Sequence, residues 1–67
     1  MFDQKLLKAK AMERGIPLSE LAKSIGRNEA TFYRKLAREG DFSRFEIQCI
    51  ANKLGLTVKE RDYIFFT

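Results

Sequence analysis

The stretch from Leu18 to Leu36 constrains the fold of this chain more than any other. Its apolar residues follow the 3.6-residue period of a helix, first at Leu18, Leu21, Ala22 and Ile25 and again at Phe32 and Leu36. Gly26 interrupts the period and Asn28 reopens it. Glycine adopts the left-handed conformation that ends a helix, and an asparagine side chain caps the helix that follows. The stretch therefore predicts two short helices joined by a tight turn.

Counted from Leu18, positions four, five, eight, nine and fifteen hold Leu21, Ala22, Ile25, Gly26 and Phe32. This pattern resembles the helix-turn-helix domains of the lambda repressor and Cro type, also called the XRE-type family. The resemblance covers roughly residues 4–56. It implies an all-α fold, a compact bundle of five short helices, with the helix-turn-helix motif at about residues 18–37. Two positions depart from the family pattern: Leu18, where a phosphate-contacting Gln is common, and Lys35, where an apolar residue is usual.

Helices are also indicated on both sides of the motif, at about residues 3–14, 43–54 and 57–64. The Ser/Thr-x-x-Glu spacing of a capping box opens the last two, at Ser43-Arg44-Phe45-Glu46 and Thr57-Val58-Lys59-Glu60. In the first helix, Leu7 and Ala11 are expected to face the core. A polar turn over residues 38–41 leads to Phe42, which we expect to be anchored inside.

Length and composition limit the chain to a single domain, residues 1–67. It has 67 residues, 45% of them hydrophobic and 33% charged, which is typical of a globular helical protein. Residues 1–38 hold nine Lys and Arg against four acids, a net +5, whereas residues 39–67 hold four against five, a net −1. An excess of positive charge around the two-helix element favours a polyanionic partner, since neutralising phosphates drives non-specific nucleic-acid binding. Charge alone is equally compatible with an ordinary basic surface.

Several classes of function lack the residues that they need. The chain has no His and a single cysteine, Cys49, so we expect neither a disulfide nor a metal site, and a cytoplasmic location. We find no nucleophile paired with a base and no glycine-rich phosphate loop, which argues against an enzyme, a cofactor or a small-molecule substrate. The longest apolar run, residues 63–66, is far too short to cross a membrane.

The third helix, from about residue 28 to 38, is the predicted reader of DNA bases. On a wheel of 100° per residue, its buried side holds Phe32 and Leu36, and the residues directed away from that side or onto its flank are Glu29, Ala30, Tyr33 and Arg34. The family resemblance implies base contacts from the same four positions, in the major groove. An arginine such as Arg34 bonds guanine O6 and N7 together, and a glutamate such as Glu29 accepts from cytosine N4.

Each of these residues also has an ordinary structural interpretation. Arg34 is alternatively a solvated surface arginine. Tyr33 is as readily part of the core margin as a partner for a sugar or a thymine methyl group. Glu29 lies in a first helical turn, where an acid interacts favourably with the helix dipole.

The resemblance further implies phosphate contacts from the second helix, the turn, and the loop after the third helix. The candidates are Ser19, Lys23, Arg27, Asn28, Thr31, Arg38, Ser43 and Arg44. For each of them a solvated surface position is the alternative.

An outward aromatic residue on the fourth helix suggests a contact with a second molecule. Phe45 and Cys49 lie opposite the apolar stripe of that helix, and Phe65 and Phe66 add apolar groups to a short C-terminal segment. One such domain covers only one half-site, so a homodimer on DNA is expected. The alternative is that the C-terminal segment of the same chain covers Phe45 and Cys49.

Two functions follow from these features. The first is a sequence-specific regulator of transcription that binds double-stranded DNA, like a phage repressor or Cro-type protein. The second is a protein-interaction module on the same fold, such as an antitoxin. Leu18, Glu29 and Lys35 favour the second, because each is unusual at its position in a DNA-binding domain.

Overall fold

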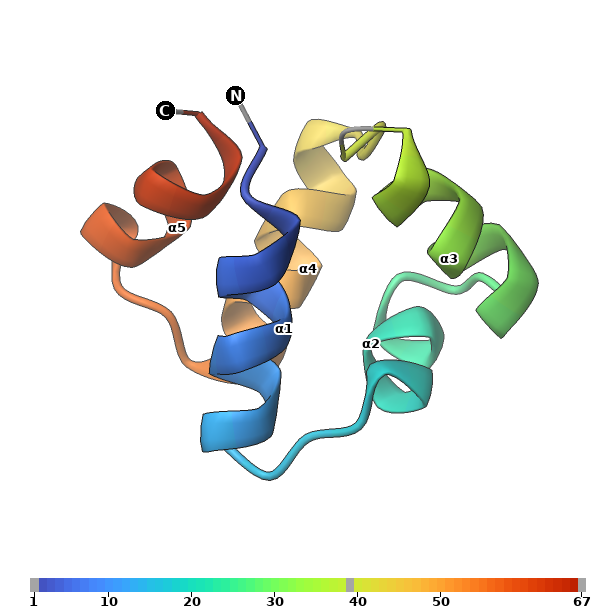
Figure 1. Cartoon of the computed structure of the whole chain (residues 1–67), viewed down its shortest axis with the longest axis horizontal. Coiled ribbons are helices and arrows are strands. Elements are labelled where there is room, and N and C mark those ends of the chain that lie inside the picture. The colour runs from blue at the N-terminus through green and yellow to red at the C-terminus, as the bar shows by residue number, and fades with distance from the viewer. Residues whose placement is uncertain (1, 39, 67) are drawn as a thin grey trace.

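The computed structural model describes residues 2–38 and 40–66, and all regular structure in this part of the chain is α-helical. The helices, drawn in Figure 1, are α1 (Gln4–Glu13), α2 (Leu18–Ser24), α3 (Glu29–Ala37), α4 (Arg44–Leu54) and α5 (Val58–Phe65). The all-α prediction is confirmed at this level. Glu39 of the predicted polar turn lies outside the described residues. None of the helices in the described ranges has the length and apolar character needed to cross a membrane.

The helices form two groups around α4. Helix α2 packs against both α3 and α4, and α5 packs against both α1 and α4. In Figure 1, α1 lies in front of α4, with α5 on one side and α2 and α3 on the other. The two ends of the chain lie next to each other at the top of the figure, where the Asp3 amide donates to the Ile64 carbonyl over 2.7 Å. Helix α3 lies at the outer edge of the molecule, on the side away from α5 (Figure 1).

Side-chain caps fix where most of these helices begin. The predicted capping boxes are present at the starts of α4 and α5, where the Ser43 and Thr57 hydroxyls accept from the backbone amides of Glu46 and Glu60. Each glutamate bonds back to the amide of its cap residue. The Asp3 side chain caps α1 by a single bond, which it accepts from the Leu6 amide. These bonds are local in sequence, which is why the pattern predicts them.

The core is built from one face of each helix. The largest side chains with 2% exposure or less are Leu7, Leu21, Phe32, Leu36, Ile50, Leu54 and Ile64. Leu7 and Ala11 face inward, as predicted for α1. An aromatic cluster closes one end, because the Phe42 ring lies 5.6 Å from Phe32 and 6.1 Å from Phe65, measured between ring centroids. Phe42 is thus anchored inside, as predicted.

The C-terminal segment divides its apolar residues between the core and the surface. Ile64 is fully buried and Phe65 is 7% exposed, whereas Tyr63 and Phe66 are about 60% exposed. Phe2 from the other end of the chain stacks on Phe65 with the ring centroids 5.4 Å apart. Phe65, one of the candidates for contact with a second molecule, therefore has its ring covered by residues of the same chain.

Candidate nucleic-acid interface

The segment between α2 and α3 sets the direction of α3. Gly26 has a φ of +72°, the left-handed conformation that ends α2, and the Arg27 amide donates to the Ala22 carbonyl over 3.0 Å. The Asn28 side chain then accepts from the Thr31 amide over 2.8 Å and opens α3. The predicted turn is confirmed in its position and in both of its caps.

Close packing holds α3 against α2. Ala22 is 1% exposed, and Phe32 and Leu36 are 0% and 2% exposed within the same core cluster. A methyl side chain at position 22 lets the two helix backbones approach, and the Phe32 ring fills the space at their junction. The side of α3 that carries Phe32 and Leu36 is therefore buried, and the opposite side is directed outward.

The four residues predicted to face bases are all exposed. Glu29, Ala30 and Arg34 lie on the outward surface of α3, and Tyr33 on its flank is 48% exposed. The Tyr33 ring still contacts the core edge, since its centroid lies 6.2 Å from that of Phe32. Arg34 is held only loosely by its own helix, with Nη2 3.5 Å from the Thr31 hydroxyl. The exposure that base contact requires is present, and base contact itself stays a prediction.

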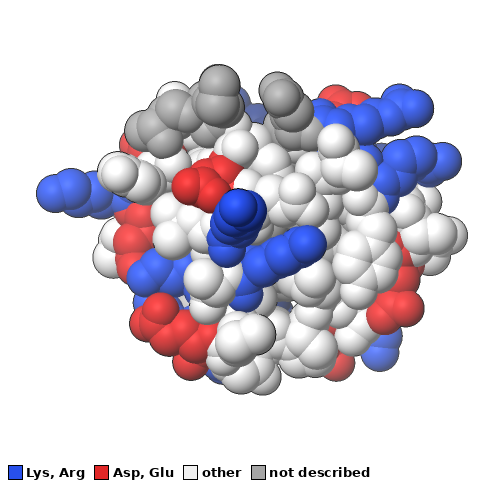
Figure 2. Space-filling view, in the orientation of Figure 1, with Lys and Arg blue, Asp and Glu red and all other residues white. Residues whose placement is uncertain are grey.

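A polar hollow of about 300 Å³ lies along α3, facing the loop that leads to α4. Six residues line it: Arg27, Thr31, Arg34, Lys35, Arg38 and Asp41. Four of the six are Lys or Arg, and only Asp41 is acidic. In Figure 2, Lys and Arg side chains also extend from the α3 side of the molecule, at the upper right. The hollow and the outward face of α3, which carries Glu29, Ala30, Tyr33 and Arg34, share Arg34, and we call the two together the α3 surface.

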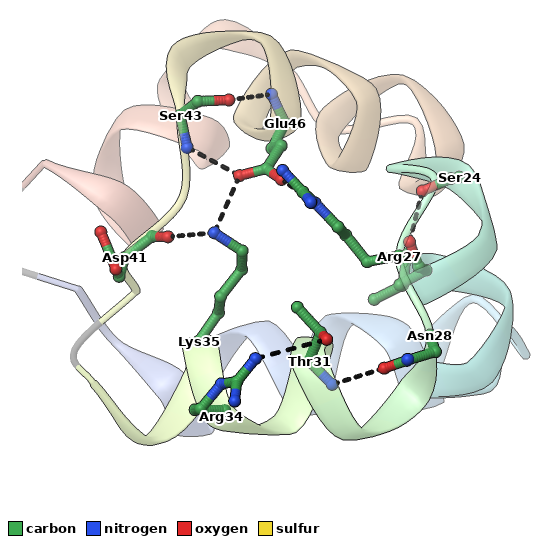
Figure 3. Close-up of polar contacts among 10 residues, drawn as sticks. Ser24, Arg27, Asn28, Thr31, Arg34, Lys35, Asp41, Ser43 and Glu46 are labelled. Carbon is green, nitrogen blue, oxygen red and sulfur yellow. Dashed lines mark hydrogen bonds and ion pairs between the residues drawn. The ribbon is translucent and has the colours of Figure 1, made fainter.

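One buried carboxylate lies behind this surface. The Glu46 side chain is only 6% exposed and contacts two cations, Arg27 Nε at 3.2 Å and Lys35 Nζ at 3.4 Å. The backbone amide of Ser43 also donates to it over 2.9 Å. Lys35 Nζ donates in addition to the Asp41 carbonyl over 2.9 Å. Figure 3 shows the Glu46 carboxylate at the point where these groups from α3, from the segment before it and from the start of α4 converge.

The environment of Glu46 keeps its carboxylate ionised. Burial by itself raises the pKa of Glu46, but the Ser43 amide, the Arg27 guanidinium and the Lys35 charge together lower it below its usual value. The two cations are unequally exposed, since 54% of the Arg27 side chain is exposed but only 19% of Lys35. Lys35 is therefore an internal partner of Glu46, while Arg27 also reaches the hollow.

The pattern in the sequence did not reveal this ion cluster. The sequence identifies Glu46 only as the acid of a capping box, and Lys35 only as an unusual residue where an apolar one is common. A cation at a position that faces the interior does carry a signal, because a buried charge requires an opposite charge nearby. Leu36, the residue after Lys35, takes the buried place on α3.

The structure brings some of the predicted phosphate-contacting residues together and separates others. Arg27, Thr31 and Arg38 share the hollow, and Asn28 joins them through its bond to the Thr31 amide. Ser43 lies on the far side of Glu46.

The remaining three lie elsewhere. Lys23 is exposed and Ser19 half-buried, both on α2. Arg44 lines a separate hollow with Arg61 and Phe66, between α4 and α5. The structure therefore does not bring Arg44 to the α3 surface.

The candidates for a contact with a second molecule also differ in exposure. Phe45 is 72% exposed and Phe66 is 57% exposed. Cys49 is half-buried and packs against the core, with its thiol free. Phe45 is therefore the most exposed aromatic residue in the described ranges, and Phe66 replaces Phe65 as the accessible group of the C-terminal segment.

Comparisons with protein-family models, with curated proteins and with solved structures find no match for this chain. The interpretation of the α3 surface therefore rests on the residues and their geometry.

Proposed function

We propose that this protein is a sequence-specific DNA-binding regulator of transcription, in which α2 and α3 form a helix-turn-helix and α3 enters the major groove of double-stranded DNA. The observation that carries the proposal is the exposure of Ala30 and Arg34 on the outward side of α3, opposite the buried Phe32. A recognition helix needs this arrangement, because its outward residues must reach base edges while its inner face stays in the core.

Arg34 carries the base recognition in this proposal. Its guanidinium is exposed, and it makes one long bond to Thr31 that is easily exchanged for a base edge. A guanidinium donates two parallel hydrogen bonds to guanine O6 and N7, which distinguishes guanine from the other bases by about 1–3 kcal/mol. Ala30, next to Arg34 on the outward face, suits contact with a thymine methyl group.

The basic hollow supplies the contacts to the DNA backbone. Arg38 lines the hollow and is exposed, and Lys23 extends from α2. Cations in such positions displace the counterions that surround phosphates, so they strengthen binding to any sequence and make it sensitive to salt.

A homodimer on a partly palindromic operator completes the proposal. One α3 reaches a single half-site, and a second copy reaches the other. Phe45 and Phe66 are exposed aromatic residues outside the α3 surface, which suits a contact between two copies. Sedimentation of Phe45→Ala and Phe66→Ala with the wild-type protein tests this. A wild-type dimer that both variants weaken supports it, and a dimer that neither affects refutes these contacts.

Salt-dependent DNA binding tests the main proposal. Binding to a random duplex is measured over a range of salt concentrations, and a preferred duplex is selected from a random library. Lys23→Ala is expected to reduce the slope of log K against log salt by about one unit. Lys53→Ala, which removes another exposed lysine from the last turn of α4, is the matched control and leaves the slope unchanged.

Two changes at Arg34 separate charge from base recognition. Arg34→Lys keeps the charge but loses the two parallel hydrogen bonds to guanine. The variant protein is therefore expected to keep its affinity for random DNA and to lose preference for the selected duplex. Arg34→Ala loses both. Absence of any binding at low salt would instead favour the protein-interaction module, in which the α3 surface holds another protein.

A further inference from the structure

The buried carboxylate of Glu46 lies directly behind a hollow in which four of the six lining residues are Lys or Arg. It lies 19 residues from Arg27 and 11 from Lys35 along the chain, and it bonds to both. Lys35 Nζ also donates to the Asp41 carbonyl and lies 6.0 Å from the centroid of the Phe42 ring. In the described part of the chain, every buried side-chain nitrogen or oxygen has a hydrogen-bond partner.

These bonds connect three elements. Arg27 precedes α3, Lys35 belongs to α3, and Glu46 lies in the first turn of α4. The carboxylate therefore fixes α3 against α4 at both ends of the hollow. The Glu46 carboxylate is 6% exposed and Lys35 is 19% exposed, so the ion pair between them is largely shielded from water, whereas Arg27 is more than half exposed. A shielded ion pair of this kind is directional, and it holds the orientation of α3 more firmly than apolar packing alone would hold it.

The same bonds also limit how much positive charge is available to a polyanion. Lys35 is directed toward Glu46 and is largely covered, and Arg27 uses its Nε for the same carboxylate. Both remain close to the hollow, so either reaches a phosphate once the carboxylate is neutralised. A surface with fewer available cations binds random DNA less tightly and depends more on contacts to bases.

We propose that Glu46 is a positioning residue for DNA recognition: it fixes α3 through Arg27 and Lys35 and withholds these two cations from the DNA backbone. The inference rests on the proposed function. It gives the preference for particular DNA sequences a second cause, in addition to the hydrogen bonds that base-contacting residues make. Glu46 itself touches no DNA in this proposal.

Glu46→Gln is the variant that tests this role. Glutamine also serves in a capping box, so the start of α4 is retained while the charge is lost. We expect stronger binding to random DNA at low salt, a slope of log K against log salt that is steeper by up to about two units for two freed cations, and a weaker preference for the selected duplex.

Glu60→Gln is the matched control. Glu60 is the capping-box acid at the start of α5, and its carboxylate also pairs with two cations, Lys10 and Arg14, but it lies away from the α3 surface. We expect the salt slope and the sequence preference of Glu60→Gln to match those of the wild type. If Glu46→Gln gives the same slope and preference as Glu60→Gln, the positioning role is refuted.

Lys35→Met gives a second test that does not depend on the folding of the first variant. In our proposal Lys35 contacts no phosphate, so its loss lowers the sequence preference and leaves the salt slope unchanged. A slope reduced by about one unit would show that Lys35 is an ordinary phosphate ligand and would overturn the proposal.

Hydrogen exchange separates failure of this inference from failure of the proposed function. In the protein without DNA, the amides of α3 are expected to exchange about tenfold faster in Glu46→Gln than in the wild type, with little change in α1. A wild-type protein that binds no DNA refutes the proposed function and the role in recognition, whereas unchanged exchange in α3 refutes the fixing of α3 itself.

Discussion

Replacing Gly40 by alanine tests how the loop before α4 packs beneath the N-terminal segment. Gly40 has a φ of +73°, and an added Cβ would lie 2.7 and 2.8 Å from Cδ1 and Cδ2 of Phe2 and closer still to Cγ. Gly26 has nearly the same φ, +72°, but nothing lies within 4 Å of the position of its Cβ. Alanine at either position must therefore adopt the left-handed conformation, and only at position 40 does it also clash with the Phe2 ring.

The magnitudes follow from these two terms. A non-glycine residue in the left-handed region costs about 1 kcal/mol, which is the whole effect expected for Gly26→Ala. In Gly40→Ala the Phe2 ring must also leave its place against Phe42 and Phe65. Burying a phenylalanine fully contributes about 1.5–3 kcal/mol, and Phe2 is half-buried, so we add about 1–1.5 kcal/mol. The expected total for Gly40→Ala is about 2–2.5 kcal/mol.

Thermal and urea unfolding of both variants measures these costs. For a domain of this size, 1 kcal/mol corresponds to about 4–8 °C in Tm, so the two variants are readily distinguished. In a Phe2→Ala background, Gly40→Ala should cost no more than Gly26→Ala, because the ring is no longer displaced. An equal loss of stability for the two single variants, or an unchanged cost without the Phe2 ring, would refute the packing described.

Two further predictions concern a surface ion cluster and the junction of α2 with α3. Bonds from the Thr57 amide and from Lys10, at 2.9 Å each, lower the pKa of Glu60 to about 2. Because the folded pKa lies below the ordinary 4.5, this carboxylate stabilises the fold above pH 4.5 and the contribution is lost as the pH falls toward 2. The Tm difference between the wild type and Glu60→Gln should therefore shrink over that range, and a constant difference would contradict it. Ala22→Leu should lower the free energy of unfolding, measured in urea, by about 1–3 kcal/mol, because Ala22 is 1% exposed and a larger side chain overpacks the core. It should also weaken DNA binding by displacing α3. Tight DNA binding by a folded Ala22→Leu variant would contradict the role of Ala22.

Much of the fold was predictable because its determinants are local. A capping box requires residues three apart, as at Ser43 and Thr57, and a glycine stop requires one left-handed residue and an apolar follower. Helical periodicity relates residues within a few turns. It correctly placed Phe32 inside and Arg34 outside, which is the basis of the proposed interface.

The tertiary structure alone decided which distant residues meet. The pairing of Glu46 with Arg27 and Lys35 depends on the path of the chain between α3 and α4, and no repeat or spacing encodes it. In the same way, Phe65 became part of the core and Phe66 stayed exposed because Phe2, from the other end of the chain, covers only the first of them. The sequence by itself determined the helices, their ends and their inward faces, since those depend on neighbouring residues. The contacts that hold α3 in place were decided by the packing of whole helices, because that packing alone brings charges far apart in the chain within bonding distance.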